Sequence, residues 1–268
     1  MARLPNTLAA LGLTLSVLAV PPAQARPRDD VRFAQVDGRK VAYAVIGREG
    51  PAIVFVAGLG EGLDASREVA WRLAAHARVI VYDRAGYGDS AAVPGLKDGA
   101  QTTAELDAVL DAAGARGPVV LIGHSIGGQI AEIYAAARPE RVAGLVLDDD
   151  RAADLAERCR LKLPGPMCKP PSLMATLFPP PMRQEFESAE RFAADVKAAA
   201  PYAGPVLVIS RHPGAGGFED LWADTQADLA RRYGAAHAVA PRGGHYVHKD
   251  AAAWFAQQVE TFVGKLEV

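Results

Sequence analysis

One segment constrains the fold more than any other: an apolar run at 118–122 that leads into Gly123-His124-Ser125-Ile126-Gly127. A helix-forming stretch, 129–138, follows at once. A strand, a sharp turn and a helix in this order predict a nucleophile elbow, with the serine hydroxyl clear of the sheet. The glycines on either side of the serine allow a turn in which a Cβ would collide. The segment therefore predicts Ser125 as a catalytic nucleophile.

Length and composition indicate one large globular domain without a strong net charge. The chain has 268 residues, half of them hydrophobic, and a formal net charge of −2. This length is enough for a single α/β domain with a full core. The small net charge favours neither nucleic acid nor an anionic membrane as a partner. We therefore expect no nucleic-acid partner, and a substrate that is recognised by a pocket.

The first 25 residues have the pattern of a cleaved signal peptide. Arg3 precedes a nearly uninterrupted apolar segment at 8–20, and Ala23-Gln24-Ala25 is a small-residue cleavage site. The apolar segment is shorter than the roughly 20 residues that cross a bilayer. We expect cleavage after Ala25 and no stable membrane anchor afterwards, with an uncleaved anchor helix as the alternative. The predicted location is the periplasm or the outside of the cell.

The two cysteines of the chain, Cys159 and Cys168, lie in a proline-rich stretch. A pair of cysteines in an exported chain predicts a disulfide. Two free, buried thiols are the alternative. Zinc is disfavoured because a structural site needs four ligands and no histidine lies near either cysteine in the sequence. We predict no metal and no cofactor.

Short apolar runs alternate with helical patterns through most of the chain. This alternation predicts a mostly parallel sheet with helices on both faces, entered through an antiparallel hairpin that turns at Asp37-Gly38. The predicted core is 26–150 together with 201–268. Strands are expected at 32–36, 40–46, 52–57, 79–82, 118–122, 142–147, 205–209 and 237–240, and helices at 64–77, 102–113, 129–138, 221–233 and 252–265.

Residues 151–200 interrupt this alternation after the sixth strand. They form an insertion far longer than a usual connection, and they hold both cysteines, three consecutive prolines at 179–181 and one helical segment at 183–197. We interpret the insertion as a small cap that limits substrate size and excludes water. A structural insertion that packs away from the site is the alternative.

The general base predicted for Ser125 is His245. Enzymes with this elbow order their triad as serine, acid and histidine along the chain. Of the six histidines, His245 lies in a glycine-rich loop after the last predicted strand, from which its side chain can return to the sheet edge. His124 points away from Ser125 because neighbours in an extended segment alternate faces. His248 is interpreted as a helix-entry residue.

Taken together, these motifs resemble those of the α/β-hydrolase superfamily over nearly all of the mature chain. Besides the elbow, Asp-Arg-Ala-Gly-Tyr-Gly-Asp-Ser at 83–90 resembles the D-R-x-G-x-G-x-S loop after the fourth strand, and Gly-Gly-His-Tyr at 243–246 resembles the histidine loop. The resemblance implies the α/β-hydrolase fold. It also implies an oxyanion hole formed by the N–H groups of Ile126 and Leu59, although Ala-Gly stands at 57–58 where many relatives have His-Gly.

The resemblance implies two positions for the acid of the triad. Many relatives carry it after the seventh strand, but no carboxylate lies near that strand end here, and Asp220 comes late, where a helix N-terminus favours acidic residues. A subset carries it after the sixth strand, where this chain has Asp148-Asp149-Asp150. Counted from Gly144, the resemblance favours Asp149, and side-chain alternation turns its two neighbours to the opposite side. We choose Asp149, with Asp220 as the alternative.

The predicted reaction is hydrolysis of a carboxylic ester of small or medium size through an acyl-enzyme. A serine nucleophile argues against epoxide hydrolase and haloalkane dehalogenase chemistry, which in this superfamily uses an aspartate. Two alternatives stay open: an aminopeptidase that resembles proline iminopeptidases, and a ligand-binding protein of this fold with marginal turnover. The substrate-binding residues are unknown at this point.

Overall fold

The computed structural model describes residues 30–163 and 175–266, and in these ranges eight strands form one sheet in the order β1-β2-β4-β3-β5-β6-β7-β8. β1 and β2 form the predicted hairpin around Asp37, β2 pairs with β4 antiparallel, and all other pairs are parallel. The predicted fold class is confirmed. The strands are β1 Arg32–Val36, β2 Arg39–Ile46, β3 Ala52–Val56, β4 Arg78–Tyr82, β5 Val119–His124, β6 Val142–Asp148, β7 Val206–Ser210 and β8 Ala236–Val239.

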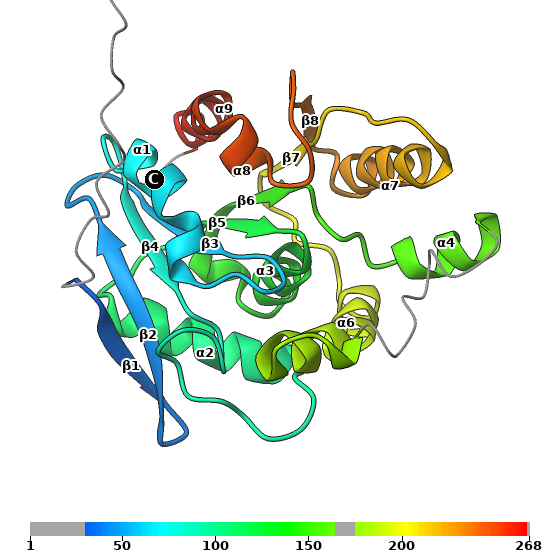
Figure 1. Ribbon diagram of the computed structural model, residues 1–268. Helices are drawn as coiled ribbons and strands as arrows, with labels where there is room; N and C mark the ends of the chain where they lie inside the picture. The colour runs from blue at the N-terminus through cyan, green and yellow to red at the C-terminus, as the bar shows by residue number, and fades with distance from the viewer. Residues whose placement is uncertain (1–29, 164–174, 267–268) are drawn as a thin grey trace, which may run out of the picture.

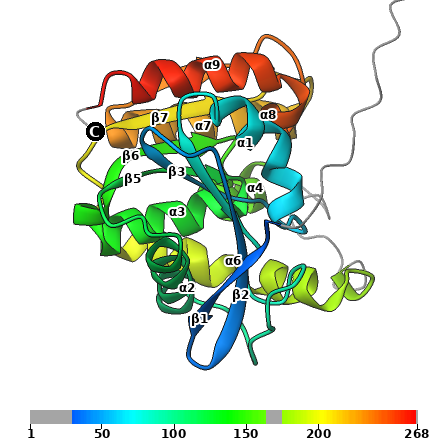
Figure 2. The same ribbon diagram turned by 90° about the vertical axis from the view of Figure 1, so that its left-hand side faces the viewer.

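Helices cover both faces of the sheet (Figure 1). α2 and α3 lie on one face and α1 and α9 on the other, and Figure 2 shows the same layers from the side. The described helices are η1 Leu63–Ser66, α1 Arg67–Leu73, α2 Gly99–Ala112, α3 Ile126–Ala137, η2 Pro139–Arg141, α4 Leu155–Lys162, α6 Pro180–Ala198, α7 Gly217–Tyr233, α8 Val247–Asp250 and α9 Ala252–Val263.

The two apolar cores follow from side-chain alternation along the buried central strand β5. Val119 and Leu121 face the core beneath α2 and α3, whereas Val120 and Ile122 face the core beneath α1 and α9. Because both faces are covered, β5 is apolar without interruption until its last residues, as expected of a parallel strand.

The strand register brings several chain segments to one edge of the sheet. His124, at the end of β5, pairs with Asp148, at the end of β6, and Asp148 pairs with Ile209 of β7. The carboxyl ends of parallel strands are where open α/β sheets bind ligands. Ser125 and Asp149 each follow such an end.

The segment between β6 and β7 holds two described helices, α4 and α6. α6 covers the predicted helix at 183–197 and packs on α3, while α4 packs on α7 through Leu155, Cys159 and Trp222. Hydrophobic periodicity did not predict α4, because only two apolar residues of this short helix are buried. Cys168 lies outside the described residues, so the disulfide stays a prediction, as does the signal peptide at 1–25. None of the helices in the described ranges is both long and apolar enough to cross a membrane.

Candidate active site

Ser125 occupies a strained turn between β5 and α3. Its backbone has φ 53° and ψ −120°, a conformation that non-glycine residues seldom adopt. The flanking glycines explain how the turn fits. A Cβ on Gly127 would lie 2.2 Å from the carbonyl oxygen of Val56, and one on Gly123 would lie 2.6 Å from that of Gly127. The local geometry is therefore the nucleophile elbow that the sequence predicts.

The structure brings Ser125, His245 and Asp149 together in a chain of hydrogen bonds. His245 Nε2 lies 2.9 Å from Ser125 Oγ, and His245 Nδ1 lies 2.6 Å from Asp149 Oδ2. Because the Asp149 carboxylate accepts, Nδ1 carries the proton and Nε2 presents its lone pair to the serine hydroxyl. This arrangement can take a proton from Ser125.

Asp149 is fully buried and accepts further hydrogen bonds from two residues that the sequence analysis did not single out. Arg211 donates its backbone N–H to Oδ1 at 3.0 Å and Nη1 to Oδ2 at 3.2 Å, and Trp222 donates Nε1–H to Oδ1 at 3.0 Å. These donors fix the carboxylate and compensate its charge. The alternative acid, Asp220, is exposed in the first turn of α7 and is not the carboxylate that contacts His245.

The two backbone N–H groups that are predicted to form an oxyanion hole belong to Ile126 and Leu59. Ile126 is the first residue of α3, so its N–H has no acceptor within that helix. Leu59 follows β3 in a turn in which Gly58 donates its N–H to Glu61 Oε2 at 3.0 Å. The Gly58 carbonyl in turn accepts Arg84 Nη2 at 2.8 Å. The Leu59 donor is thus held in place by polar contacts on the preceding residue.

His124 connects the turn after β3 with the loop of His245. Its Nδ1 lies 3.0 Å from Glu61 Oε2, and its Nε2 donates to the carbonyl oxygen of His245 at 2.9 Å. The ring is 1% exposed, and burial lowers its pKa against the opposing effect of Glu61. Burial disfavours a charge on Glu61, but His124 and Lys249 outweigh it and hold the pKa of this carboxyl below its ordinary value. His124 thus contacts the loop that carries His245.

His248 and Asp148 form a buried contact beside the site. His248 is the second residue of α8, a helix-entry position as interpreted, and it is also buried, with its Nδ1 2.6 Å from Asp148 Oδ2. Burial raises the pKa of Asp148 to about 7 and lowers that of His248 to about 4. Asp148 and Asp150, the neighbours of Asp149, are both fully buried.

Glu61, His124 and His248 are also close enough to be tested as metal ligands. One atom of each lies within 4.8 Å of the others. However, the Glu61 carboxylate accepts from Gly58 and Lys249, and both nitrogens of His124 face hydrogen-bond partners. A cation would have to replace these contacts and would meet the Lys249 ammonium. The residues therefore fit a hydrogen-bond network better than a metal centre.

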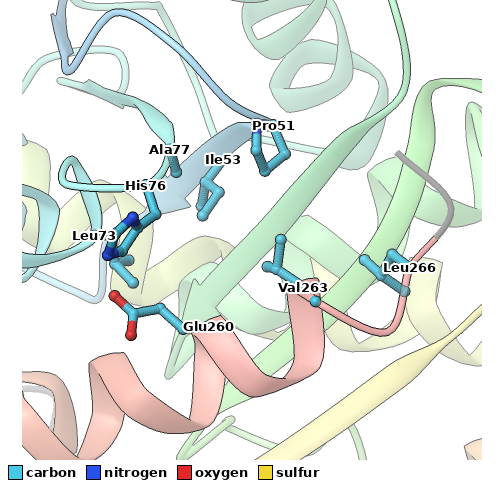
Figure 3. Close-up of a pocket in the computed structure, with 9 residues that line it drawn as sticks. Pro51, Ile53, Leu73, His76, Ala77, Glu260, Val263 and Leu266 are labelled. Atoms are coloured by element: carbon cyan, nitrogen blue, oxygen red, sulfur yellow. The ribbon is translucent and has the colours of Figure 1, made fainter.

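A cavity of about 620 Å³ opens at Ser125 and His245. The segment between β6 and β7 contributes Arg151, Leu155 and Phe186 to its lining, and α7 contributes Trp222. A second cavity, of about 500 Å³, lies between the start of β3 and the end of α9 (Figure 3). Its lining residues include no serine, threonine or cysteine. Of these two cavities, only the first has a serine or a cysteine among its described lining residues.

Comparisons with known proteins indicate the same fold. A family model described as the alpha/beta hydrolase fold matches residues 51–209 of the chain. A protein of Azorhizobium caulinodans provisionally named carbamate hydrolase RutD is 38% identical over 119 residues, which are 44% of this chain and 44% of that protein. Lipase LipV of Mycobacterium tuberculosis is 53% identical over 55 residues, 20% of this chain and 21% of LipV. The chain thus spans less than half the length of these curated relatives.

Solved structures match over most of the chain. Esterase RhEst1 from Rhodococcus sp. ECU1013 is 26% identical with a TM-score of 0.60, and the match covers 88% of this chain and 99% of that one. An esterase from Thermogutta terrifontis is 21% identical with a TM-score of 0.65, covering 88% and 98%. Together with the sheet order and the elbow, the matched family model shows that the chain belongs to the alpha/beta hydrolase fold family.

Proposed function

We propose that the protein is a serine hydrolase that cleaves a carboxylic ester of small or medium size. One observation carries the proposal: Ser125 Oγ lies 2.9 Å from His245 Nε2, and the other nitrogen of the same ring lies 2.6 Å from Asp149 Oδ2. This is the geometry in which a histidine can activate a serine hydroxyl. The relatives named as a lipase and as esterases support an ester as the bond that is cleaved.

In the proposed reaction, Ser125 Oγ attacks the ester carbonyl carbon while His245 Nε2 takes the hydroxyl proton. The N–H groups of Ile126 and Leu59 bind the oxyanion that forms. When the tetrahedral intermediate collapses, the C–O bond to the alcohol breaks and His245 gives its proton to the leaving oxygen. Water then attacks the acyl-enzyme, with its proton passing to His245, and releases the acid and the free serine.

A second candidate, an aminopeptidase, is favoured by acidic residues in the same cavity. Glu187 and Glu190 both line it with Ser125. A carboxylate can pair with the free N-terminal ammonium of a peptide. However, Glu190 Oε1 already lies 3.5 Å from Arg151 Nη2. A peptide ammonium would have to compete with this guanidinium for the carboxylate. The ester reaction therefore stays the leading proposal.

A panel of p-nitrophenyl esters of increasing acyl length, with aminoacyl p-nitroanilides, tests both candidates. We expect turnover of short and medium esters, covalent labelling by a fluorophosphonate, and loss of both in Ser125→Ala. Hydrolysis of the anilides alone would favour the aminopeptidase. A folded protein that neither turns over a panel member nor becomes labelled would contradict both and favour a ligand-binding role.

A further inference from the structure

The Arg84 guanidinium joins the turn after β3 to helix α6. Arg84 is 1% exposed and donates from Nη1 to the Ala57 carbonyl at 2.6 Å and from Nη2 to the Gly58 carbonyl at 2.8 Å. On its other side, Nε and Nη2 donate to the two carboxylate oxygens of Glu185 at 2.8 and 2.7 Å. Glu185 lies on α6, 101 residues further along the chain. One side chain thus bridges the sheet edge and the inserted segment.

The contact to Gly58 bears directly on the Leu59 N–H. The Gly58 carbonyl and the Leu59 N–H belong to one planar trans peptide, and they point in opposite directions. Fixing the carbonyl oxygen therefore fixes the direction of the N–H group. The backbone N–H of Glu61 donates to the same carbonyl at 3.1 Å, so this peptide is held by two donors.

Glu185 also contacts the other polar groups around Arg84. It is fully buried, accepts from the Tyr87 hydroxyl at 2.8 Å, and lies 3.5 Å from Lys97 Nζ. Tyr87 in turn accepts the N–H of Gly60 at 3.2 Å, which is a second link from α6 to the same turn. Burial opposes a charge on Glu185, but Arg84 outweighs it and keeps the pKa of this carboxyl below its ordinary value.

A buried ion pair of this kind contributes little to the free energy of unfolding. Apolar residues of similar volume often serve a core at least as well, because the desolvation of two charges offsets their attraction. What an apolar pair would lack here is the directed hydrogen bond to the Gly58 carbonyl. The value of the Arg84–Glu185 pair therefore lies in the geometry it imposes.

We propose that Arg84 and Glu185 are positioning residues that connect helix α6 to the oxyanion hole. Arg84 orients the Gly58–Leu59 peptide, and Glu185 holds Arg84 so that α6 and the oxyanion donor move as one unit. The inference rests on the proposed ester hydrolysis and names how the inserted segment acts in it. A displacement of α6 would then lower the rate of the chemical step and not substrate binding alone.

The deciding variant is the double substitution Arg84→Met with Glu185→Met, which removes both charges of the pair and leaves Lys97 Nζ with the Ala85 carbonyl, at 2.8 Å, as its acceptor. Glu185→Gln accompanies it, and Asp195→Asn is the matched control. Asp195 also joins α6 to the core, by accepting the N–H of Gly99 at 2.9 Å, but it does not contact the turn after β3. We would measure kcat and KM on the best ester and the inhibition constant of its trifluoromethyl ketone, whose adduct places an oxyanion in the hole.

We expect kcat of the double variant to fall by about 10- to 100-fold, with KM within about threefold, because one oxyanion donor is misplaced. The inhibition constant should rise by a factor similar to the fall in kcat/KM, while Asp195→Asn stays near wild type. A folded double variant with wild-type kcat and ketone affinity would overturn the proposal, as would a change in KM alone.

A double variant without native near-UV circular dichroism would also overturn it, because the pair would then support the fold. A wild-type protein without ester turnover or fluorophosphonate labelling would instead refute the proposed function itself.

Discussion

At the scale of single residues, Asp149 can be separated from Asp220 by two matched substitutions. Asp149→Asn should lower kcat by roughly 10³- to 10⁴-fold, because an amide beside His245 Nδ1 favours the wrong tautomer and does not stabilise the imidazolium. Asp220→Asn should leave kcat within about twofold, since Asp220 is exposed on α7. Steady-state ester kinetics on both variants provide the measurement. Loss of turnover in Asp220→Asn alone would contradict the assignment.

His124 offers a second test at this scale. His124→Phe keeps a ring at this buried position, where the ring centroids of His124 and His248 are 4.6 Å apart. The variant loses the hydrogen bonds to Glu61 and to the His245 carbonyl. We expect kcat to fall by about tenfold, because the loop of His245 and the turn after β3 are then no longer connected through His124. His76→Phe, at an exposed position, is the control and should keep full activity. Equal rates in the two variants would show that this connection is unimportant.

Ser125 and Asp149 could be proposed because each directly follows a buried strand that is visible in the sequence, whereas His245, in the loop after β8, was proposed from its order along the chain. The residues around them were harder to predict. Trp222 and Glu185 reach the site only through the packing of α7 and α6, and no local pattern distinguishes them from other residues on those helices. Arg84 was visible within a motif, but its partner was not. Contacts between distant segments depend on tertiary geometry that strand and helix periodicity does not encode.

At the scale of elements, the elbow depends on the close approach of α3 to β3. Gly127→Ala would place a Cβ 2.2 Å from the Val56 carbonyl and 2.4 Å from the Ala57 carbonyl, both of them backbone atoms that cannot turn aside. We expect the free energy of unfolding to fall by about 1–3 kcal/mol, as for overpacked cores, together with reduced kcat. Gly117→Ala, where a Cβ meets nothing within 4 Å, is the control for urea denaturation. A Gly127→Ala protein of wild-type stability would contradict this account of the turn.

The predicted bounds agree best with the structure for the continuously buried strands. They agree least at the first residues of helices. The helix expected at 102–113 begins earlier, at Gly99, because the Asp98 side chain caps it by accepting the N–H of Gln101 at 2.9 Å. The helix expected from 221 begins at Gly217, ahead of the apolar residues that signalled it. The helix expected at 64–77 is divided into η1 and the shorter α1. Capping residues and local turns therefore determine the helix boundaries, which hydrophobic periodicity does not specify.

At the scale of the whole molecule, several carboxyl groups are buried together beside α3, β6 and α7. Burial raises the pKa of Glu132 to about 7, and it raises that of Asp150, with repulsion from Glu132 adding to the effect. Neither Asp150 carboxylate oxygen has a hydrogen-bond partner within residues 30–163 and 175–266. The folded state therefore favours protonated carboxyls here, whereas the unfolded chain ionises them near their ordinary values. Such groups stabilise the fold fully at low pH, and their contribution is lost as pH rises.

Glu132→Gln isolates one of these groups and makes the pH dependence measurable. A carboxyl whose pKa rises from 4.5 to about 7 on folding contributes about 3 kcal/mol below pH 4.5, and this contribution disappears as pH rises through 7. Glutamine stays neutral and can still accept the Tyr233 hydroxyl, which donates to Glu132 at 2.7 Å. We therefore expect the free energy of unfolding of Glu132→Gln, relative to wild type, to increase between pH 5 and pH 8. Urea denaturation at several pH values measures the difference, and Glu140→Gln at an exposed position is the control. A difference that stays constant with pH, or decreases as pH rises, would show that Glu132 is ionised in the folded protein and compensated by its surroundings.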